Sequence, residues 1–265
     1  MAVLGRNEDS RRIKSTVTLK ADASADGTTP EDRGGDAFRE AAGIDPKALA
    51  VRIFGADATG SPGLQRREPS SRSDREKAER QAIISTGVLP LLESLGTVEA
   101  QGTEHKVRFR GALVEKHQRM NGWVPVVTQD RKIGITHAIP SEYLRRLELQ
   151  NDLFGDKIRI IGITKAHRFA TTQPTLKGGE PTELEIRQIL EDAGWERVPI
   201  GLQELPTILM GSTWWHREEK VILLDARKPN FKKTDFGILP IDLVLADLTP
   251  EMGTLLGLAN SPTDK

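Results

Sequence analysis

The chain has 265 residues and no cysteine, and 38 basic side chains balance 38 acidic ones, so its formal net charge is zero. A neutral chain lacks the basic surplus of proteins that coat nucleic acid, which disfavours nucleic acid as the main partner. Without cysteine it can form neither a disulfide nor a cysteine zinc site. The N-terminus has no apolar signal region, and no apolar run reaches the length of a membrane span. We therefore expect a cytoplasmic protein without a membrane partner.

Residues 1–75 are predicted to be a disordered tail. They are rich in Gly, Ser, Asp and Arg, and they hold too little apolar surface to offset the entropy cost of ordering. One short exception, Pro46–Phe54, is predicted to be a strand or a transient element.

The rest of the chain alternates predicted helices with predicted hairpins. Helical spacing and helix-stop residues predict three helices, at Asp74–Glu93, Ser141–Phe154 and Thr182–Ala193. Short apolar runs separated by turn residues predict strands at Lys106–Phe109, Ala112–Gln118, Ile158–Thr164, Arg168–Thr172, Ser212–His216, Val221–Leu224, Phe231–Lys233 and Ile238–Ile241. This order predicts an α+β fold with mostly antiparallel sheet.

A candidate phosphotransfer site lies near the C-terminus. Asp225 and Asn230 have the D-x-x-x-x-N spacing of a kinase catalytic loop, and the tripeptide Asp235-Phe236-Gly237 matches the kinase metal motif. Only four residues separate Asn230 from Asp235, too few for the two strands and the turn that must intervene. Asp and Gly are common turn residues, so we predict that 234–237 is a hairpin loop.

Asp242 is the better metal candidate. It lies twelve residues after Asn230, which leaves room for one strand up, the turn, and one strand back. The returning strand would bring the Asp242 carboxylate next to the Asp225–Asn230 loop. A magnesium ion prefers such carboxylate and amide oxygens as ligands.

These segments resemble kinase-like phosphotransferases. Asp225–Asn230 followed by Pro240-Ile241-Asp242-Leu243 is similar to the aminoglycoside- and choline-kinase pattern. Together with 102–107 and 140–156, it resembles the kinase-like module of polyvalent proteins from phages and conjugative elements. The resemblance covers roughly residues 80–247 and implies a small two-lobed protein-kinase-like fold with a truncated C-lobe. The lobes would be residues 76–175 and 176–265.

The resemblance also implies roles for individual residues. Asp225 would be the catalytic aspartate, and Asn230 and Asp242 would hold Mg²⁺. Residues on the nucleotide side would be Gly102, Glu104 and His105 in a phosphate loop, Lys116 on the α- and β-phosphates, Glu142 as the ion-pair partner of Lys116, and Gln173 near the adenine hinge. Lys106 competes with Lys116 for its role, and Glu148 competes with Glu142.

The sequence departs from the family pattern in three ways. Leu223 stands where the catalytic loop has its histidine, and the phosphate loop has one glycine instead of three. Only 23 residues, 243–265, follow Asp242, which leaves no room for a kinase activation segment and peptide platform.

The prediction is therefore an ATP- and Mg²⁺-dependent phosphotransferase that acts on a protein or small-molecule hydroxyl. The alternative is a catalytically inactive kinase-fold module that binds a nucleotide or a protein in phage or mobile-element conflict. A third interpretation is a structural protein, since Asp, Asn and Pro are turn residues whatever the function. The five histidines show no metal-ligand spacing, which disfavours zinc.

Overall fold

The computed structural model describes residues 43–55, 71–93, 97–198 and 212–258. All of them belong to one unit, Phe38–Lys265. It contains helices and antiparallel sheets, so the α+β prediction is confirmed. The described helices are α1 (Pro46–Phe54), α2 (Arg72–Thr86), α3 (Pro140–Phe154), α4 (Glu183–Asp192) and α5 (Pro250–Leu255), with a short 3-10 helix, η3, at Lys228–Asn230.

The largest sheet has five strands in the order β1-β2-β3-β7-β6. Its members are β1 (Ala100–Gln101), β2 (His105–Arg110), β3 (Leu113–Gln118), β6 (Arg159–Ile163) and β7 (Phe169–Pro174). All its neighbouring strands are antiparallel. The chain leaves this sheet after β3, forms the β4–β5 hairpin (Trp123–Val127 and Ile133–His137) and α3, and returns through β6.

The C-terminal part contains a four-stranded antiparallel sheet and one hairpin. The sheet order is β13-β10-β9-β8, with β8 (Trp195–Arg197), β9 (Trp214–His216), β10 (Val221–Leu224) and β13 (Val244–Asp247). The hairpin of β11 (Phe231–Thr234) and β12 (Gly237–Pro240) lies in sequence between β10 and β13, which pair with each other. The chain therefore leaves the sheet after β10, forms the hairpin, and returns to the sheet as β13 beside β10.

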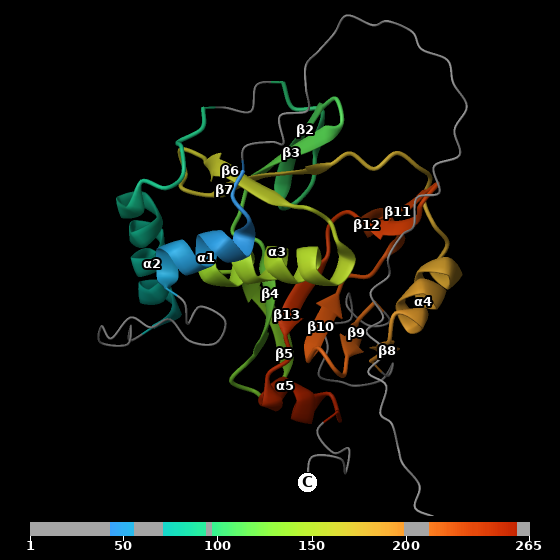
Figure 1. Cartoon of the computed structure of the whole chain (residues 1–265). Coiled ribbons are helices and arrows are strands. Elements are labelled where there is room, and N and C mark those ends of the chain that lie inside the picture. The colour runs from blue at the N-terminus through green and yellow to red at the C-terminus, as the bar shows by residue number, and fades with distance from the viewer. Residues whose placement is uncertain (1–42, 56–70, 94–96, 199–211, 259–265) are drawn as a thin grey trace, which may run out of the picture. The chain divides into compact units, whose positions relative to one another are not determined.

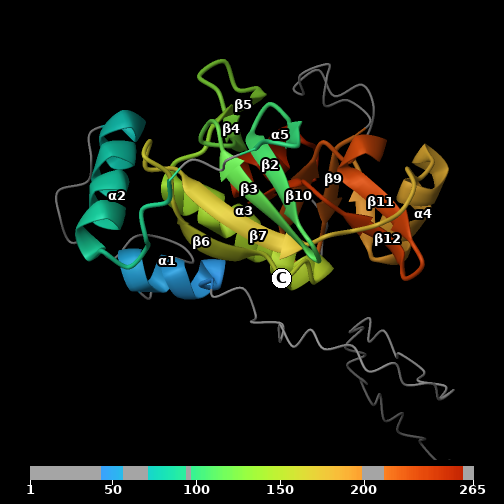
Figure 2. The same cartoon turned by 90° about the horizontal axis from the view of Figure 1, so that it is seen from above.

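Helix α3 lies between the two sheets, as Figure 1 shows. Pro140 begins the helix, and the Glu142 carboxylate accepts a hydrogen bond from the Ile139 amide, which stabilises its first turn. Gly155 ends it with φ of 70°, a left-handed conformation that suits glycine. Seen from above, α1 and α2 lie at one end of the sheets, and α4 lies at the other end beside β11 and β12 (Figure 2).

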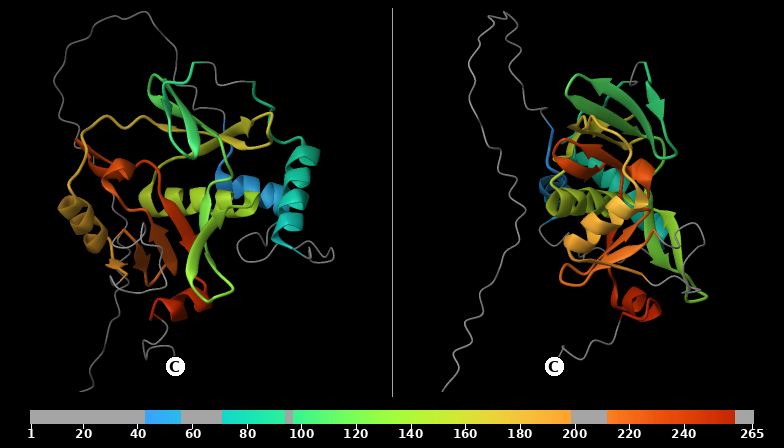
Figure 3. Two further views of the ribbon diagram at one scale, coloured as in Figure 1. Left: turned by 180° about the vertical axis from the view of Figure 1, so that it is seen from behind. Right: turned by 90° about the vertical axis from the view of Figure 1, so that its right-hand side faces the viewer.

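Among the described residues, the core consists of three apolar clusters. One lies around α1, α3 and the inner face of the five-stranded sheet, with Leu49, Leu144 and Ile160 fully buried. The other two lie on opposite faces of the four-stranded sheet, and the adjacent residues Trp214 and Trp215 are buried in different ones. The second of these faces packs against α5, which also contacts β4 (Figure 3).

The strand predicted as one alternative for residues 46–54 is wrong. Pro46–Phe54 is a helix, because Asp45 accepts hydrogen bonds from the amides of Lys47 and Ala48 and Pro46 occupies the first turn. Leu49 and Phe54 of this helix are buried, so this exception within the predicted tail packs into the folded unit. Residues 1–42 and 56–70 of that predicted tail lie outside the described residues.

Other element boundaries follow the sequence with small shifts. Helix α2 ends at Thr86, earlier than predicted, because Gly87 adopts a left-handed conformation. The β4–β5 hairpin, β1, β8, β13 and α5 were not predicted. In the described parts of the chain, no helix has the length and apolar character needed to cross a membrane.

Candidate functional site

A cavity of about 910 Å³ lies between the five-stranded sheet and the C-terminal segments. Its walls come from the turn before β2, from β2 and β3, from the 174–178 linker after β7, and from the segments around Asp225 and Asp242. Seven residues predicted for the site line it: Gly102, Glu104, His105, Lys116, Asp225, Asn230 and Asp242. The remaining two, Glu142 and Gln173, do not.

The Asp225–Asn230 loop is fixed by its own side chains. The side-chain Nδ2 of Asn230 donates hydrogen bonds to the Asp225 backbone oxygen at 2.7 Å and to the Asp225 carboxylate at 2.8 Å. Arg227 forms an ion pair with the other carboxylate oxygen of Asp225. Asp225 has φ of 62°, an uncommon conformation for a residue other than glycine. The loop thus holds the Asp225 carboxylate at the cavity wall.

The β11–β12 hairpin brings Asp242 to this loop. Phe231 pairs with Pro240 at the base of the hairpin, and the Ile241 amide donates a hydrogen bond to the Asn230 oxygen at 2.8 Å. Asp235 and Phe236 form the turn at the far end, where Phe236 is 76% exposed. The prediction that the Asp235-Phe236-Gly237 tripeptide is a hairpin turn is confirmed.

The Asp242 carboxylate has two neighbouring nitrogen-bearing side chains, Arg146 and His105. Arg146 of α3 donates to one oxygen at 2.7 Å, and the His105 Nδ1 lies 3.4 Å from the other. Burial raises the pKa of Asp242, but His105, Lys116 and Arg146 together outweigh burial and hold this pKa well below its usual range. Asp242 is therefore ionised at neutral pH.

Lys116 is a buried lysine on the central strand β3. Its ammonium donates a hydrogen bond to the Ile241 backbone oxygen at 2.7 Å, next to Asp242. Burial lowers the pKa of Lys116, and the nearby charges of Asp242 and Asp156 oppose this effect. Lys106, the competing lysine, is exposed on β2.

The predicted ion pair between Lys116 and Glu142 is wrong. Glu142 forms a bidentate ion pair with Arg72 of α2 and caps the first turn of α3. Glu148, the competing glutamate, pairs with Lys47 and Arg145. The carboxylates of Glu142 and Glu148 are therefore occupied by basic side chains other than Lys116.

The residues of the predicted phosphate loop line the cavity, but Gln173 of the predicted hinge does not. The Gly102 amide donates to the His105 oxygen at 2.9 Å, so residues 102–105 form a tight turn. Gln173 is buried behind the cavity wall, and its amide makes a long contact of 3.4 Å with the Ile241 oxygen. Pro174 and the four residues after it face the cavity instead.

Sequence reasoning missed Arg146, which lies between the carboxylates of Glu104 and Asp242. Its guanidinium is only 2% exposed and donates to each carboxylate at 2.7 Å. The one feature of the sequence that pointed to a buried Arg146 is its position three residues after the buried Tyr143, on the same face of the helix. An arginine on a helix is usually a surface charge, so this spacing alone did not reveal its role.

Comparison of the chain with protein-family models, with curated proteins and with solved structures finds no match. The function is therefore argued from the geometry of the cavity.

Proposed function

We propose that the chain is an ATP- and Mg²⁺-dependent phosphotransferase with a kinase-like arrangement. One observation carries the proposal: strand β3 with Lys116, the loop with Asp225 and Asn230, and the segment with Asp242 meet at the wall of one cavity. Phosphoryl transfer needs this set, because catalysis rests on positioning and on neutralising the phosphate charge.

The strand arrangement supports the same proposal. Protein kinases carry the phosphate-binding lysine on their third strand, and Lys116 lies on β3, the middle of the five-stranded sheet. In this proposal residues 76–175 form the N-lobe and 176–265 a reduced C-lobe, with 174–178 as the linker. Helix α1, which precedes residue 76, packs on the first of these parts.

The cavity has the size and composition to accept a nucleotide. Its volume lies within the ~300–1,000 Å³ range of small-molecule sites. Val107, Val114 and Leu224 supply apolar wall for a base near the 174–178 linker. Lys116 and Arg227 supply positive charge for phosphates, and Asn230 and Asp242 supply oxygen atoms for the metal.

Each side chain then has a role in transfer. Lys116 holds the phosphates, and Asp225 accepts the proton of the acceptor hydroxyl as its oxygen bonds to the terminal phosphorus. The bond from that phosphorus to the bridging oxygen breaks, and ADP leaves with the electron pair. Asn230 and Asp242 would hold a Mg²⁺ ion, which would neutralise charge on the phosphate oxygens. The acceptor is a protein or a small molecule with a free hydroxyl.

A second candidate is a kinase-like module that binds nucleotide or a protein without transfer. It is favoured by the missing Lys116–Glu142 pair and by the contacts of Arg146 and His105, which engage both oxygens of Asp242. In active protein kinases the lysine–glutamate pair must be in place.

Calorimetric titration of ATP into the full chain, with and without MgCl₂, tests the proposal. The full chain is needed because α1 belongs to the core. We expect binding that requires Mg²⁺ and is lost in Asp242→Ala, together with transfer of labelled γ-phosphate. Asp247→Ala on β13, whose carboxylate pairs with Arg145, is the matched control.

Two other results have distinct meanings. Binding that depends on neither Mg²⁺ nor Asp242 supports the inactive module. A folded chain that binds no nucleotide contradicts both candidates.

A further inference from the structure

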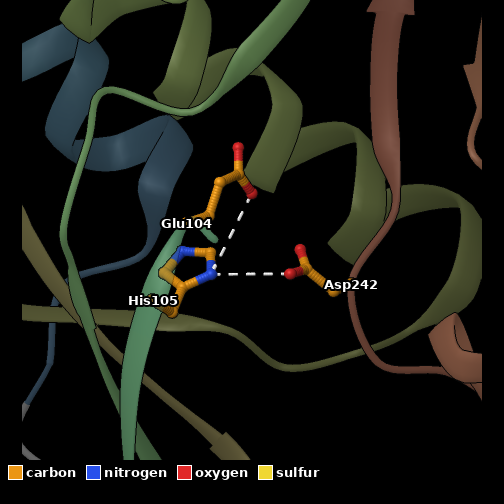
Figure 4. A group of neighbouring side chains, drawn as sticks. All are labelled: Glu104, His105 and Asp242. Atoms are coloured by element: carbon orange, nitrogen blue, oxygen red, sulfur yellow. Dashed lines mark ion pairs between the residues drawn. The ribbon is translucent and has the colours of Figure 1, made fainter. Parts of the chain in front are cut away.

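Three ligand atoms converge on one point beside the cavity. His105 Nδ1 lies 3.4 Å from Asp242 Oδ2 and 4.0 Å from Glu104 Oε2, as Figure 4 shows. Glu104 and His105 are adjacent, but Glu104 lies in the turn before β2 and is not part of the strand, so both side chains face the same side. Asp242 arrives from the other side of the cavity, after the β11–β12 hairpin.

The other atoms of these side chains are held by a second set of partners. Arg146 donates to Glu104 Oε1 and to Asp242 Oδ1, each at 2.7 Å, which leaves Oε2 and Oδ2 directed at His105. The Tyr143 hydroxyl lies 3.0 Å from His105 Nε2, which leaves Nδ1 directed at the carboxylates. Metal sites orient their ligands in this way, through outer partners on the far atoms of histidine and carboxylate.

The spacing suits a small cation. Ligand atoms about 2.1 Å from a tetrahedral ion lie roughly 3.4 Å apart, which is the separation of Nδ1 and Oδ2. The Glu104 oxygen lies 4.0 Å from Nδ1 and within 4.8 Å of the Asp242 oxygen, so it would move inward to complete the site. Glu104 and His105 are both at least nine-tenths buried, whereas the Asp242 side chain is 37% exposed, so a bound ion would be open to the cavity on the Asp242 side.

The donor set indicates the class of ion. Mg²⁺ and Ca²⁺ take oxygen ligands, whereas an imidazole nitrogen with two carboxylates favours first-row transition ions. We infer that Glu104, His105 and Asp242 form a binding site for one divalent first-row transition-metal ion, such as Mn²⁺ or Zn²⁺. The site shares Asp242 with the proposed phosphotransferase site, but it requires neither nucleotide nor Asn230.

This site could not be found from histidine spacing. His105 has no second histidine as a partner, and Asp242 is 137 residues away in the sequence. Only the fold brings the two together.

Titration of the chelator-treated full chain with MnCl₂, without nucleotide, tests the inference. The electron paramagnetic resonance signal of free Mn²⁺ reports binding, and we expect one ion per chain that millimolar Mg²⁺ does not displace. The spin-echo spectrum of the bound ion should show coupling to an imidazole nitrogen. This wild-type readout does not depend on whether any variant folds.

Matched variants then separate this site from the proposed magnesium site. We expect His105→Gln and Glu104→Gln to weaken Mn²⁺ binding at least tenfold, and Tyr143→Phe to weaken it by about tenfold through the outer partner. His167→Asn removes an exposed imidazole in the β6–β7 turn and should leave affinity unchanged.

The inference is overturned if the wild-type chain binds no Mn²⁺, if the bound ion shows no nitrogen coupling, or if Asn230→Ala abolishes binding while His105→Gln does not. This last result would instead support the metal ligands of the proposed function. Nucleotide binding with Mg²⁺, measured separately, decides the proposed function whichever result is found.

Discussion

Lys116 is the residue whose replacement most directly tests nucleotide binding. Its ammonium is buried at the cavity wall, so a bound phosphate would be its strongest partner. We expect Lys116→Met to weaken ATP affinity at least tenfold while the chain stays folded, because methionine fills a similar volume without a buried charge. Calorimetry with ATP and Mg²⁺ measures the affinity. Lys106→Met, on the neighbouring strand and exposed, is the control and should bind as the wild type does.

Replacing Asp225 tests the proposed transfer step separately from nucleotide binding. We expect Asp225→Asn to keep the loop, because an amide can still meet Asn230, and to lower the rate of phosphate transfer by about 10²–10⁴-fold through loss of the proton acceptor. ATP affinity should change little. Asp235→Asn, at the hairpin turn, is the control for the kinase motif. An equal loss of transfer in Asp235→Asn would contradict the assignment of Asp225.

The residue pattern near the C-terminus could be predicted because it is local. Loop length fixes where Asp225, Asn230 and the hairpin turn lie, and a twelve-residue separation left room for Asp242 to return. The partners of Lys116 and Asp242 could not be predicted in this way. Glu142 and Arg146 lie on one helix, and only the packing of α3 decides that Arg146 faces the cavity while Glu142 faces α2.

The linker after β7 depends on close contact with β11. A Cβ at Gly178 would lie 2.1 Å from the Lys233 backbone oxygen, too close for any side chain, and the next residue forms two backbone hydrogen bonds with Lys233. We expect Gly178→Ala to push the linker away, to destabilise the fold by about 1–3 kcal/mol, and to weaken ATP binding.

Gly179→Ala is the matched control for this linker, because its added Cβ would meet nothing within 4 Å. Chemical unfolding and ATP titration compare the two variants. If both behaved as the wild type does, the linker contact with β11 would not hold in solution.

Substitutions in helix α1 test whether this helix contributes to the core. Leu49 is fully buried against α3, whereas Val51 is 42% exposed on the same helix. We expect Leu49→Ala to lower the free energy of unfolding by about 2–5 kcal/mol. Val51→Ala should change it by no more than about 0.5 kcal/mol. A Leu49→Ala variant as stable as the wild type would mean that α1 does not pack on the domain.

Elements with strong local signals were predictable, and elements that depend on distant partners were not. The β2–β3 and β11–β12 hairpins have clear turns, and α3 has a proline start and a glycine stop. By contrast, β13 becomes a strand by pairing with β10, some twenty residues earlier. Helix α1 has a helix-start signal, with Asp45 as N-cap and Pro46 in the first turn, but it lies inside a segment whose composition favours disorder.

At the scale of the whole molecule, charges connect the parts that enclose the cavity. Arg145 of α3 pairs with Asp247 of β13 and with Glu148, which also pairs with Lys47 of α1. Arg146 connects α3 to both walls of the cavity. Ion pairs of this kind add little stability where they are exposed, but they fix relative positions. Helix α3 is therefore the element through which a ligand in the cavity would affect the rest of the fold.

Asp156, just after α3, makes the stability of the whole fold depend on pH. Burial raises its pKa to about 7, although a hydrogen bond from Gln150 and the charge of Lys116 act in the opposite direction. The folded chain therefore keeps a proton that the unfolded chain loses near pH 4. As pH rises from about 4 to 7, this group lowers stability by up to about 1.4 kcal/mol per pH unit, and above about pH 7 it adds no further change.

Replacing Asp156 by asparagine removes the titrating proton and retains a polar partner for Gln150. We expect Asp156→Asn to match the wild type near pH 4 and to exceed its stability by on the order of 2–4 kcal/mol at pH 8. Denaturant unfolding at several pH values measures the difference. Asp152→Asn, exposed on α3, is the control and should follow the wild type throughout. A constant difference across the pH range would show that Asp156 titrates in the folded chain as it does in the unfolded one.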